Sequence, residues 1–357
     1  MDEKRLAWAD LLRVLAIAGV LLIHSAAPLL VRYSSAGATA WWIGNAYDSA
    51  VRWCVPLFLM LSGALLLGRP QPLGRFLSSR LRRVAVPFVA WSAIYLLWAR
   101  HFHGQRLEAG DLPRLLLEGP AYYHLWFFYV ILALYLLVPL LCALLRRVGR
   151  RGAWALVGAW MLVVSVLPVV GDLAGWREAP ESVELSPLAY LGYFVLGFLL
   201  RDLPSRGRHL GLLSALLAAA WALTAAGTWL LTVRLGGGLF DGLFYEYCSV
   251  NVLLMSVAVF LLGKSARLPA GLRRARGHLA RALRSLSASS LGVYLVHALV
   301  IDLLKSGRLG MRFDQTSLHP LVGVPLFAAT VFALSLVIVA RRAACSGLPR
   351  STIPSSP

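Results

Sequence analysis

Charged residues are scarce in this sequence. They make up 14% of the 357 residues, whereas hydrophobic residues make up 59%. A soluble domain carries about 25% charged residues, so this deficit argues against an ordinary soluble fold. The composition predicts an all-α polytopic membrane protein, because helices satisfy their own backbone hydrogen bonds in lipid.

Cysteine is also scarce, and its spacing is irregular. The four cysteines are Cys54, Cys142, Cys248 and Cys345. They form no C-x-x-C pair and no zinc-type spacing. The sequence therefore indicates neither a disulfide framework nor a metal site.

We expect no cleavable leader at the N-terminus. Asp2, Glu3 and Asp10 interrupt the basic region that a signal peptide needs, and no small-residue cleavage site follows. We therefore expect the first apolar segment to be retained. The net charge of +19 raises the alternative of a nucleic-acid binder. However, the basic residues occur in short clusters between apolar runs, and no aromatic-basic nucleic-acid module is present.

Long apolar segments are abundant. A membrane helix needs about 20 mostly apolar residues. By this criterion ten spans are predicted, of which the sixth is short: 11–31, 51–68, 84–101, 124–145, 153–171, 186–200, 210–233, 246–263, 286–304 and 320–340. No internal repeat is visible.

The basic residues alternate between the two sides of this arrangement. Most of the 35 lie before the first span, in every second loop and after the last span. The positive-inside rule therefore predicts that both termini are cytoplasmic, which agrees with an even number of spans. We expect one membrane domain over residues 1–345 and a disordered Ser/Pro-rich tail over 346–357.

The first predicted span carries two ionisable residues, Arg13 and His24. Eleven residues at about 100° each complete about three turns, so both side chains share one helix face, roughly 16 Å apart. Ionisable groups within a span are functional candidates by default. The alternatives are a positive-inside anchor for Arg13 and a structural hydrogen bond for His24.

Arg80 and Arg83 precede the third predicted span. Residues at i and i+3 are neighbours on a helix, and two guanidiniums suit bidentate binding of a phosphate. The alternative is a cluster that only sets topology.

Four further residues are candidates for lining a substrate cavity. Ser62 lies beside Gly63 in the second span, a combination that permits either close helix packing or a polar cavity. Trp126 opens the fourth span, where an interfacial anchor is the default interpretation. Tyr294 and His297 lie in the ninth span, with His297 at a depth similar to His24, and a structural hydrogen bond is the alternative for it.

Five motifs occur in a fixed order: Arg13 with His24, Val55-Pro-Leu-Phe with Ser62-Gly63, Arg80-x-x-Arg83 with Val86-Pro-Phe, Tyr123-His-Leu-Trp126, and Leu291-Gly-Val-Tyr-x-x-His297. Together they resemble the membrane acyltransferase family 3, bacterial integral-membrane O-acyltransferases of sugars and cell-surface glycans. The likeness runs from about residue 5 to 340. Ala64 departs from the pattern, because many relatives have an aromatic residue after Ser-Gly.

The resemblance implies a ten-helix protein of the bacterial inner membrane. It implies acetyl-CoA as co-substrate, a glycan or lipid-linked sugar as acceptor, His24 as the catalytic residue, and Arg13, Arg80 and Arg83 as donor-binding residues. His24 is then expected to be the general base for the acceptor hydroxyl. An acetyl-histidine intermediate stays open.

A different class of function fits some of the same residues. Two histidines within the membrane and arginines at its inner side also suit a transporter or flippase of a lipid-linked glycan. The lack of repeats and of acidic residues at mid-depth argues against it. A structural or sensory membrane protein is a third alternative.

Overall fold

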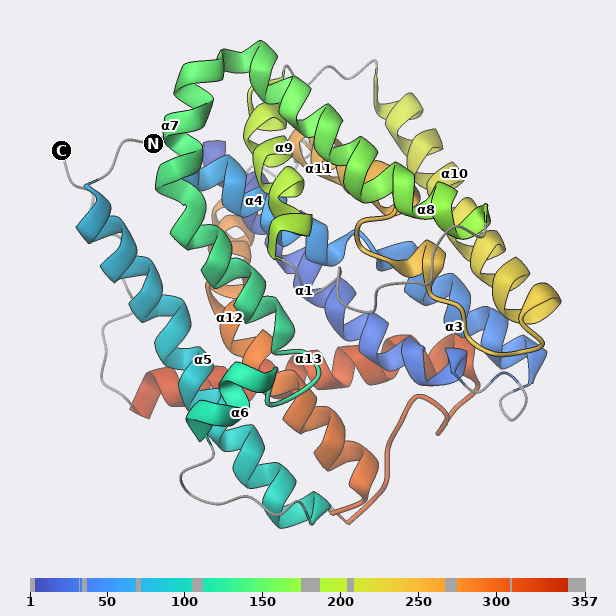
Figure 1. Ribbon diagram of the computed structural model, residues 1–357. Coiled ribbons are helices and arrows are strands. Elements are labelled where there is room, and N and C mark those ends of the chain that lie inside the picture. Colours follow the sequence, from blue (N-terminus) through green and yellow to red (C-terminus); the bar gives the residue numbers. More distant parts are fainter. Residues whose placement is uncertain are drawn as a thin grey trace. The chain divides into compact units, whose positions relative to one another are not determined.

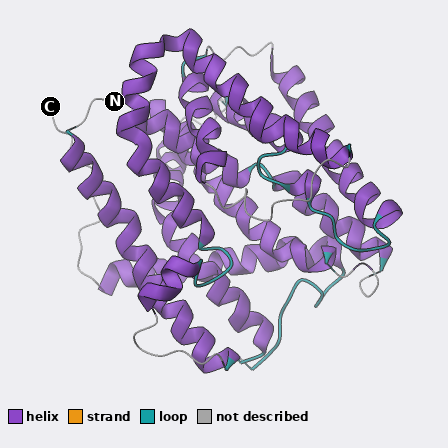
Figure 2. Ribbon diagram, in the orientation of Figure 1, coloured by secondary structure: helices purple, strands orange, loops and turns teal. Residues whose placement is uncertain are grey.

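Every regular element among the described residues is a helix, and Figure 2 shows no strand there. The computed structural model describes residues 4–31, 33, 37–68, 72–104, 112–174, 187–203, 209–266, 275–308 and 310–345. This confirms the all-α prediction; the tail expected at 346–357 lies outside the described residues. The chain forms two compact units, residues 1–48 with 268–357, and residues 49–267.

The first unit contains helices from both ends of the chain. They are α1 (Lys4–Leu30), α12 (Ala275–Ser306), α13 (Pro320–Cys345) and most of α3 (Ala38–Val51). Helix α1 packs against both α12 and α13, and α12 packs against α13 (Figure 1). Residues at opposite ends of the sequence therefore share one core.

Helices α1 and α12 run parallel to each other. Arg13 of α1 contacts Ser287 of α12, and eleven residues later His24 contacts His297. From the first contact to the second, the residue numbers increase on both helices, so the helices are parallel and their register is fixed. A parallel pair agrees with the predicted topology, in which the first and ninth spans cross the membrane in the same direction.

Helix α3 falls where the sequence analysis predicted no span. Trp41 is fully buried, and its indole N–H donates to the Leu30 carbonyl at the end of α1 at 3.0 Å. That bond satisfies one of the carbonyls that a helix terminus leaves without a partner. Gly44 lies directly against Leu29. With 14 residues, α3 is too short to be predicted as a span by itself. Its helix is stabilised by packing on α1.

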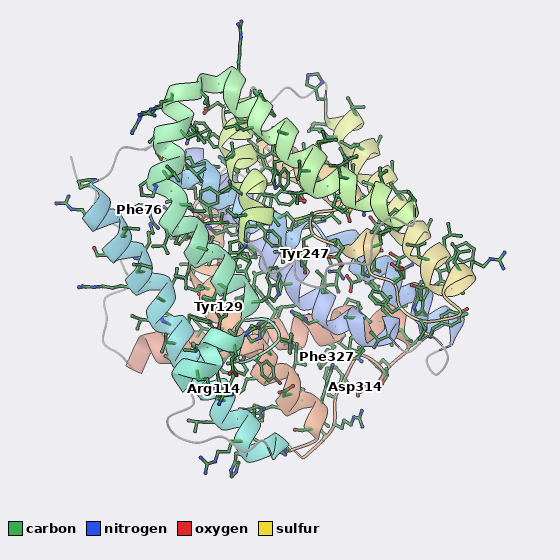
Figure 3. All side chains as sticks on the ribbon, viewed as in Figure 1. Phe76, Arg114, Tyr129, Tyr247, Asp314 and Phe327 are labelled. Atoms are coloured by element: carbon green, nitrogen blue, oxygen red, sulfur yellow. The ribbon has the colours of Figure 1, made fainter. Side chains whose placement is uncertain are left out.

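The loop between α12 and α13 is ordered by Asp314 (Figure 3). Its carboxylate accepts hydrogen bonds from the backbone N–H and hydroxyl of Thr316 at 2.8 and 2.6 Å and from the Arg312 guanidinium at 3.1 Å. Burial by itself raises the pKa of Asp314, but these hydrogen bonds outweigh it and hold the pKa below its ordinary value.

The second unit comprises the remaining described helices. They are α4 (Cys54–Leu66), α5 (Leu73–His103), α6 (Leu112–Glu118), α7 (Trp126–Trp160), the π-helix η1 (Met161–Val166), α8 (Leu167–Leu173), the 3₁₀ turn η2 (Pro187–Tyr190), α9 (Leu191–Arg201), α10 (Leu210–Trp229), the π-helix η4 (Leu230–Leu235), the 3₁₀ turn η5 (Leu243–Tyr245) and α11 (Val250–Ser265). The closest packing is between α4 and α9 and between α10 and α11.

Two glycines allow α4 and α9 to meet backbone to backbone. A Cβ atom added to Gly63 would lie 1.8 Å from the Phe194 carbonyl oxygen, and one added to Gly197 would lie 1.9 Å from that of Met60. Small residues at such crossings are a main device of helix association in membranes. The Ser62-Gly63 motif therefore includes a close-packing element.

Helix α7 bends sharply at Gly149, which has φ 65° (Figure 1). The apolar helical stretch Trp126–Gly171 has 46 residues, so a straight helix would be roughly 69 Å long, about twice the thickness of a bilayer's apolar core. Arginines flank the bend: Arg146, Arg147, Arg150 and Arg151. The stretch is therefore two spans, as predicted.

The described residues include eight helices long and apolar enough to cross a membrane, and a shorter apolar helix, Pro187–Arg201. Counting the two arms of Trp126–Gly171 separately and adding the short helix gives the ten predicted spans. The protein is a polytopic membrane protein. Helix α5 extends beyond the third predicted span, because it begins at Leu73 and so includes Arg80 and Arg83.

Candidate functional site

Two histidines predicted to lie at similar depth are in direct contact. The His24 and His297 rings stack with centroids 5.2 Å apart and 25° between their planes. His297 is fully buried and His24 is half-buried. Both lie in the C-terminal half of their spans, Ala7–Leu30 and Gly277–Ser306. Of the pair, His24 is thus the ring that retains exposed surface.

The backbone fixes the orientation of His297. Its Nδ1 lies 2.6 Å from the carbonyl oxygen of Tyr294, one helical turn earlier. A carbonyl only accepts, so Nδ1 carries the proton, and in the neutral ring Nε2 bears the lone pair. The Tyr294 ring lies 5.5 Å from the His297 ring. The structure thus brings together three predicted site residues: His24, Tyr294 and His297.

Arg13 contacts α12 eleven residues before His24 on α1. Its Nη1 lies 3.4 Å from the Ser287 hydroxyl and 3.6 Å from the Asp10 carboxylate. The Ser287 hydroxyl in turn donates to that carboxylate at 2.7 Å. Arg13 therefore belongs to a polar network between two helices.

Arg80 and Arg83 share α5 but differ in their surroundings. Arg80 lies on the buried side of the helix, in line with Phe76 and Val84, and is half-buried, whereas Arg83 is exposed. The Nε of Arg80 is shielded from solvent, and the described residues offer it no hydrogen-bond partner. A shielded donor of this kind calls for an explanation, and a bound anion would supply one.

Ser62 has a local partner. Its hydroxyl donates to the Phe58 carbonyl of its own helix at 2.9 Å. Helix α4 is unbroken from Cys54 to Leu66. This geometry favours the packing interpretation of the Ser62 motif over a break that lines a cavity.

Trp126 belongs to an aromatic cluster within the second unit. Its indole stacks on the Tyr247 ring at 5.7 Å and lies 5.7 Å from the Tyr190 ring. The Arg52 guanidinium lies over the rings of Tyr245, at 4.2 Å, and Tyr247, at 5.4 Å. Trp126 and Tyr247 are both half-buried, so the cluster presents aromatic surface together with a cation.

The neighbouring residues of this motif have structural roles. Tyr129 donates to the carbonyl oxygens of Leu116 and Gly119 at 2.8 Å each and thereby ties α6 to α7 (Figure 3). His124 is buried with its ring edge-on to Tyr95 at 5.0 Å. Within the described part of the chain, no three His, Cys, Asp or Glu side chains gather as they would to hold a metal ion.

Residues 6–340 match the family model of acyltransferase family 3, which describes an acyltransferase domain. The chain belongs to acyltransferase family 3. It is therefore a membrane acyltransferase, and the match spans both compact units. Neither a curated protein nor a solved structure gave a match.

The residues by which the family was predicted are divided between the two units of this acyltransferase. Arg13, His24, Tyr294 and His297 lie in the first unit, and the other four candidates lie in the second: Ser62, Arg80, Arg83 and Trp126. The histidine pair and the Arg13 network thus form one continuous arrangement on α1 and α12.

Several polar residues of these clusters escaped the sequence analysis. Asp10 was noted only as an interruption of a basic leader, and Ser287 lies outside the five motifs. The signal for Ser287 was a run of serines, Ser285, Ser287, Ser289 and Ser290, at the start of an apolar helix. Arg52 and Tyr247 carried no sequence signal, because their contact depends on the packing of distant segments.

Proposed function

We propose that this acyltransferase transfers an acetyl group from acetyl-CoA to a hydroxyl of a cell-surface glycan or of its lipid-linked precursor. The observation that carries the proposal is the stacked His24–His297 pair, with ring centroids 5.2 Å apart, together with Arg13 in the N-terminal half of α1. A histidine within a span, in line with a cation near the membrane edge, suits a donor with an anionic end and a reactive end.

The chemistry needs a base. A ring nitrogen of His24 takes the proton of the acceptor hydroxyl while the hydroxyl oxygen attacks the thioester carbonyl. The C–S bond then breaks, and the thiolate leaves and takes the proton from the imidazolium. A positioned base of this kind contributes about 10²–10⁴-fold to the rate.

His24 suits this role better than His297. His24 is half-buried and so retains a surface that a substrate can reach, whereas His297 is fully buried and uses Nδ1 to hold a backbone carbonyl. In this proposal His297 is a positioning residue: its ring packs against His24 and limits the orientations of the base.

Guanidiniums hold the donor phosphates. Arg13 lies roughly 16 Å before His24 along α1, a separation that an extended pantetheine arm bridges. The shielded Nε of Arg80 supports a role for that residue in anion binding, and Arg83 adds positive charge on the same helix.

The aromatic cluster offers a contact for the acceptor. The half-buried rings of Trp126 and Tyr247 suit the apolar C–H face of a sugar ring, and the guanidinium of Arg52 suits its hydroxyls or an acidic substituent. Tyr294 supports the histidine pair, and Ser62 contributes to the packing of α4.

The proposal includes a location and a finer resemblance. The ten spans are proposed to cross the bacterial inner membrane, and the clusters of basic residues support a cytoplasmic location of both termini. Within the family, we propose that the chain is most like the enterobacterial common antigen O-acetyltransferase.

The experiment is to incubate the purified protein in lipid nanodiscs with acetyl-CoA that carries a radiolabelled acetyl group. Release of free CoA thiol and labelling of glycan extracted from cells lacking the gene are the expected results. A transporter or flippase of a lipid-linked glycan would release no CoA and would transfer no label. Mass spectrometry of the glycan with and without the gene identifies the acetylated hydroxyl.

A further inference from the structure

The Ser287 hydroxyl connects Arg13 to α12. Ser287 receives an N–H of Arg13 at 3.4 Å and donates its own O–H to Asp10 at 2.7 Å. Asp10 and Arg13 lie three residues apart on α1, so they are neighbours on one helix face. Ser287 is buried, whereas the Arg13 side chain is 34% exposed.

The directions of these bonds are mutually consistent. A hydroxyl has one proton and two lone pairs. The proton of Ser287 goes to the carboxylate, which leaves the lone pairs for the guanidinium. An arginine has a long side chain with many rotamers, and ordering it on binding a ligand costs conformational entropy. Contacts that already fix the side chain in the free protein reduce this cost. Asp10 and Ser287 both meet Nη1 and therefore fix one end of the guanidinium.

The helix register gives this contact a functional setting. From Ser287 to His297 is ten residues on α12, and from Arg13 to His24 is eleven on α1. The polar contact and the histidine pair are thus two contacts between the same two parallel helices, roughly 15 Å apart along their axes. In the proposed function Arg13 holds the donor, so its direction sets the position of the donor relative to His24.

We propose that Ser287, oriented by Asp10, is a positioning residue that aims the Arg13 guanidinium at the phosphates of the acyl-CoA donor. This inference rests on the proposed function, because it takes the donor to be an acyl-CoA. It assigns a role to a residue of α12 that lies outside the five motifs and one helix away from the arginine.

The test compares two donors on the full-length protein in nanodiscs. Acetyl-CoA carries the phosphates, and S-acetylpantetheine has the same thioester and arm without them. Ser287→Ala is expected to weaken acetyl-CoA binding about tenfold, the usual effect of losing a hydrogen bond to a charged group. It is expected to leave the affinity for S-acetylpantetheine unchanged. Ser287→Thr keeps the hydroxyl and is expected to restore most of the acetyl-CoA affinity.

The matched control is Ser289→Ala. Its hydroxyl lies on the same helix but donates only to the Ser285 carbonyl at 2.9 Å, so both affinities are expected to equal those of the wild type. In the Arg13→Ala background, Ser287→Ala is expected to have no further effect, because a residue that acts through Arg13 loses its role with it.

Two results would overturn the positioning role. Unchanged acetyl-CoA affinity in Ser287→Ala would show that the contact does not aim Arg13. An equal loss for both donors, or additive losses with Arg13→Ala, would show a packing effect instead. Wild-type protein that binds no acetyl-CoA would overturn the donor assignment itself. The two failures can be told apart, because a failed positioning role leaves wild type and Ser287→Ala binding acetyl-CoA with equal affinity.

Discussion

The imidazole rings of His24 and His297 stack with their centroids 5.2 Å apart, although 272 residues separate them in the chain. The contact places the half-buried ring against the fully buried one. Because Arg13 meets Ser287 ten to eleven residues earlier, the same helix pair connects the proposed base with the proposed donor anchor.

The bend at Gly149 is predicted to face the cytoplasm. A membrane-impermeant maleimide added outside intact spheroplasts should label Leu239→Cys, which is 80% exposed in a loop on the predicted outer side. It should label Arg151→Cys, exposed beside the bend, only after the membrane is permeabilised. Native cysteines are first replaced by alanine. Labelling of Arg151→Cys from outside would contradict the orientation.

Much of this fold was predictable because membrane spans depend on apolar length, which is a local property. Each of the ten predicted segments contains helix in the described residues. Helix α3 was missed because it is stabilised by α1, through Trp41 and Gly44, rather than by its own length. The sequence places His297 within a predicted span, but its contact with His24 could not be predicted, because helix register depends on the packing of side chains.

Arg80 and Arg83 are predicted to contribute unequally to donor binding. Arg80→Ala removes a shielded donor and is expected to weaken acetyl-CoA binding by about 1.5–3 kcal/mol. Arg83 is exposed, so Arg83→Ala should have a smaller effect that added salt diminishes further. Arg82→Ala, exposed on the same helix, is the control. Equilibrium binding of labelled acetyl-CoA measures all three, and an unchanged affinity in a folded Arg80→Ala protein would leave Arg80 as a topology signal.

Gly63 is predicted to be irreplaceable for packing. Gly63→Ala would bring a methyl group against the Phe194 carbonyl and force α4 and α9 apart. Overpacking of this kind costs about 1–3 kcal/mol or more, which should appear as a lower unfolding temperature in detergent. Gly211→Ala in α10 meets no atom within 4 Å and should be neutral or slightly stabilising. Equal unfolding temperatures for the two variants would refute the close crossing.

Asp314 is predicted to make the ordering of its loop pH-dependent. Its pKa lies below the ordinary value of 3.8, so the unfolded chain binds the proton more readily. The stabilisation is complete above about pH 4 and is lost as pH falls through the folded-state pKa. Asp314→Asn should therefore lower the unfolding temperature at pH 7, and the difference from wild type should shrink toward pH 3. A difference that grows on acidification would show the opposite sign.

The most direct measurement is acetyl transfer and acetyl-CoA binding by purified wild type, His24→Ala and His297→Ala. Because His24 is the proposed base, His24→Ala should lose at least about 100-fold in transfer rate while it stays folded and binds acetyl-CoA normally. His297 is proposed to position that base, so His297→Ala should retain more activity. Substantial transfer by His24→Ala, or an inactive His297→Ala that binds the donor normally, would contradict the assignment of the base to α1.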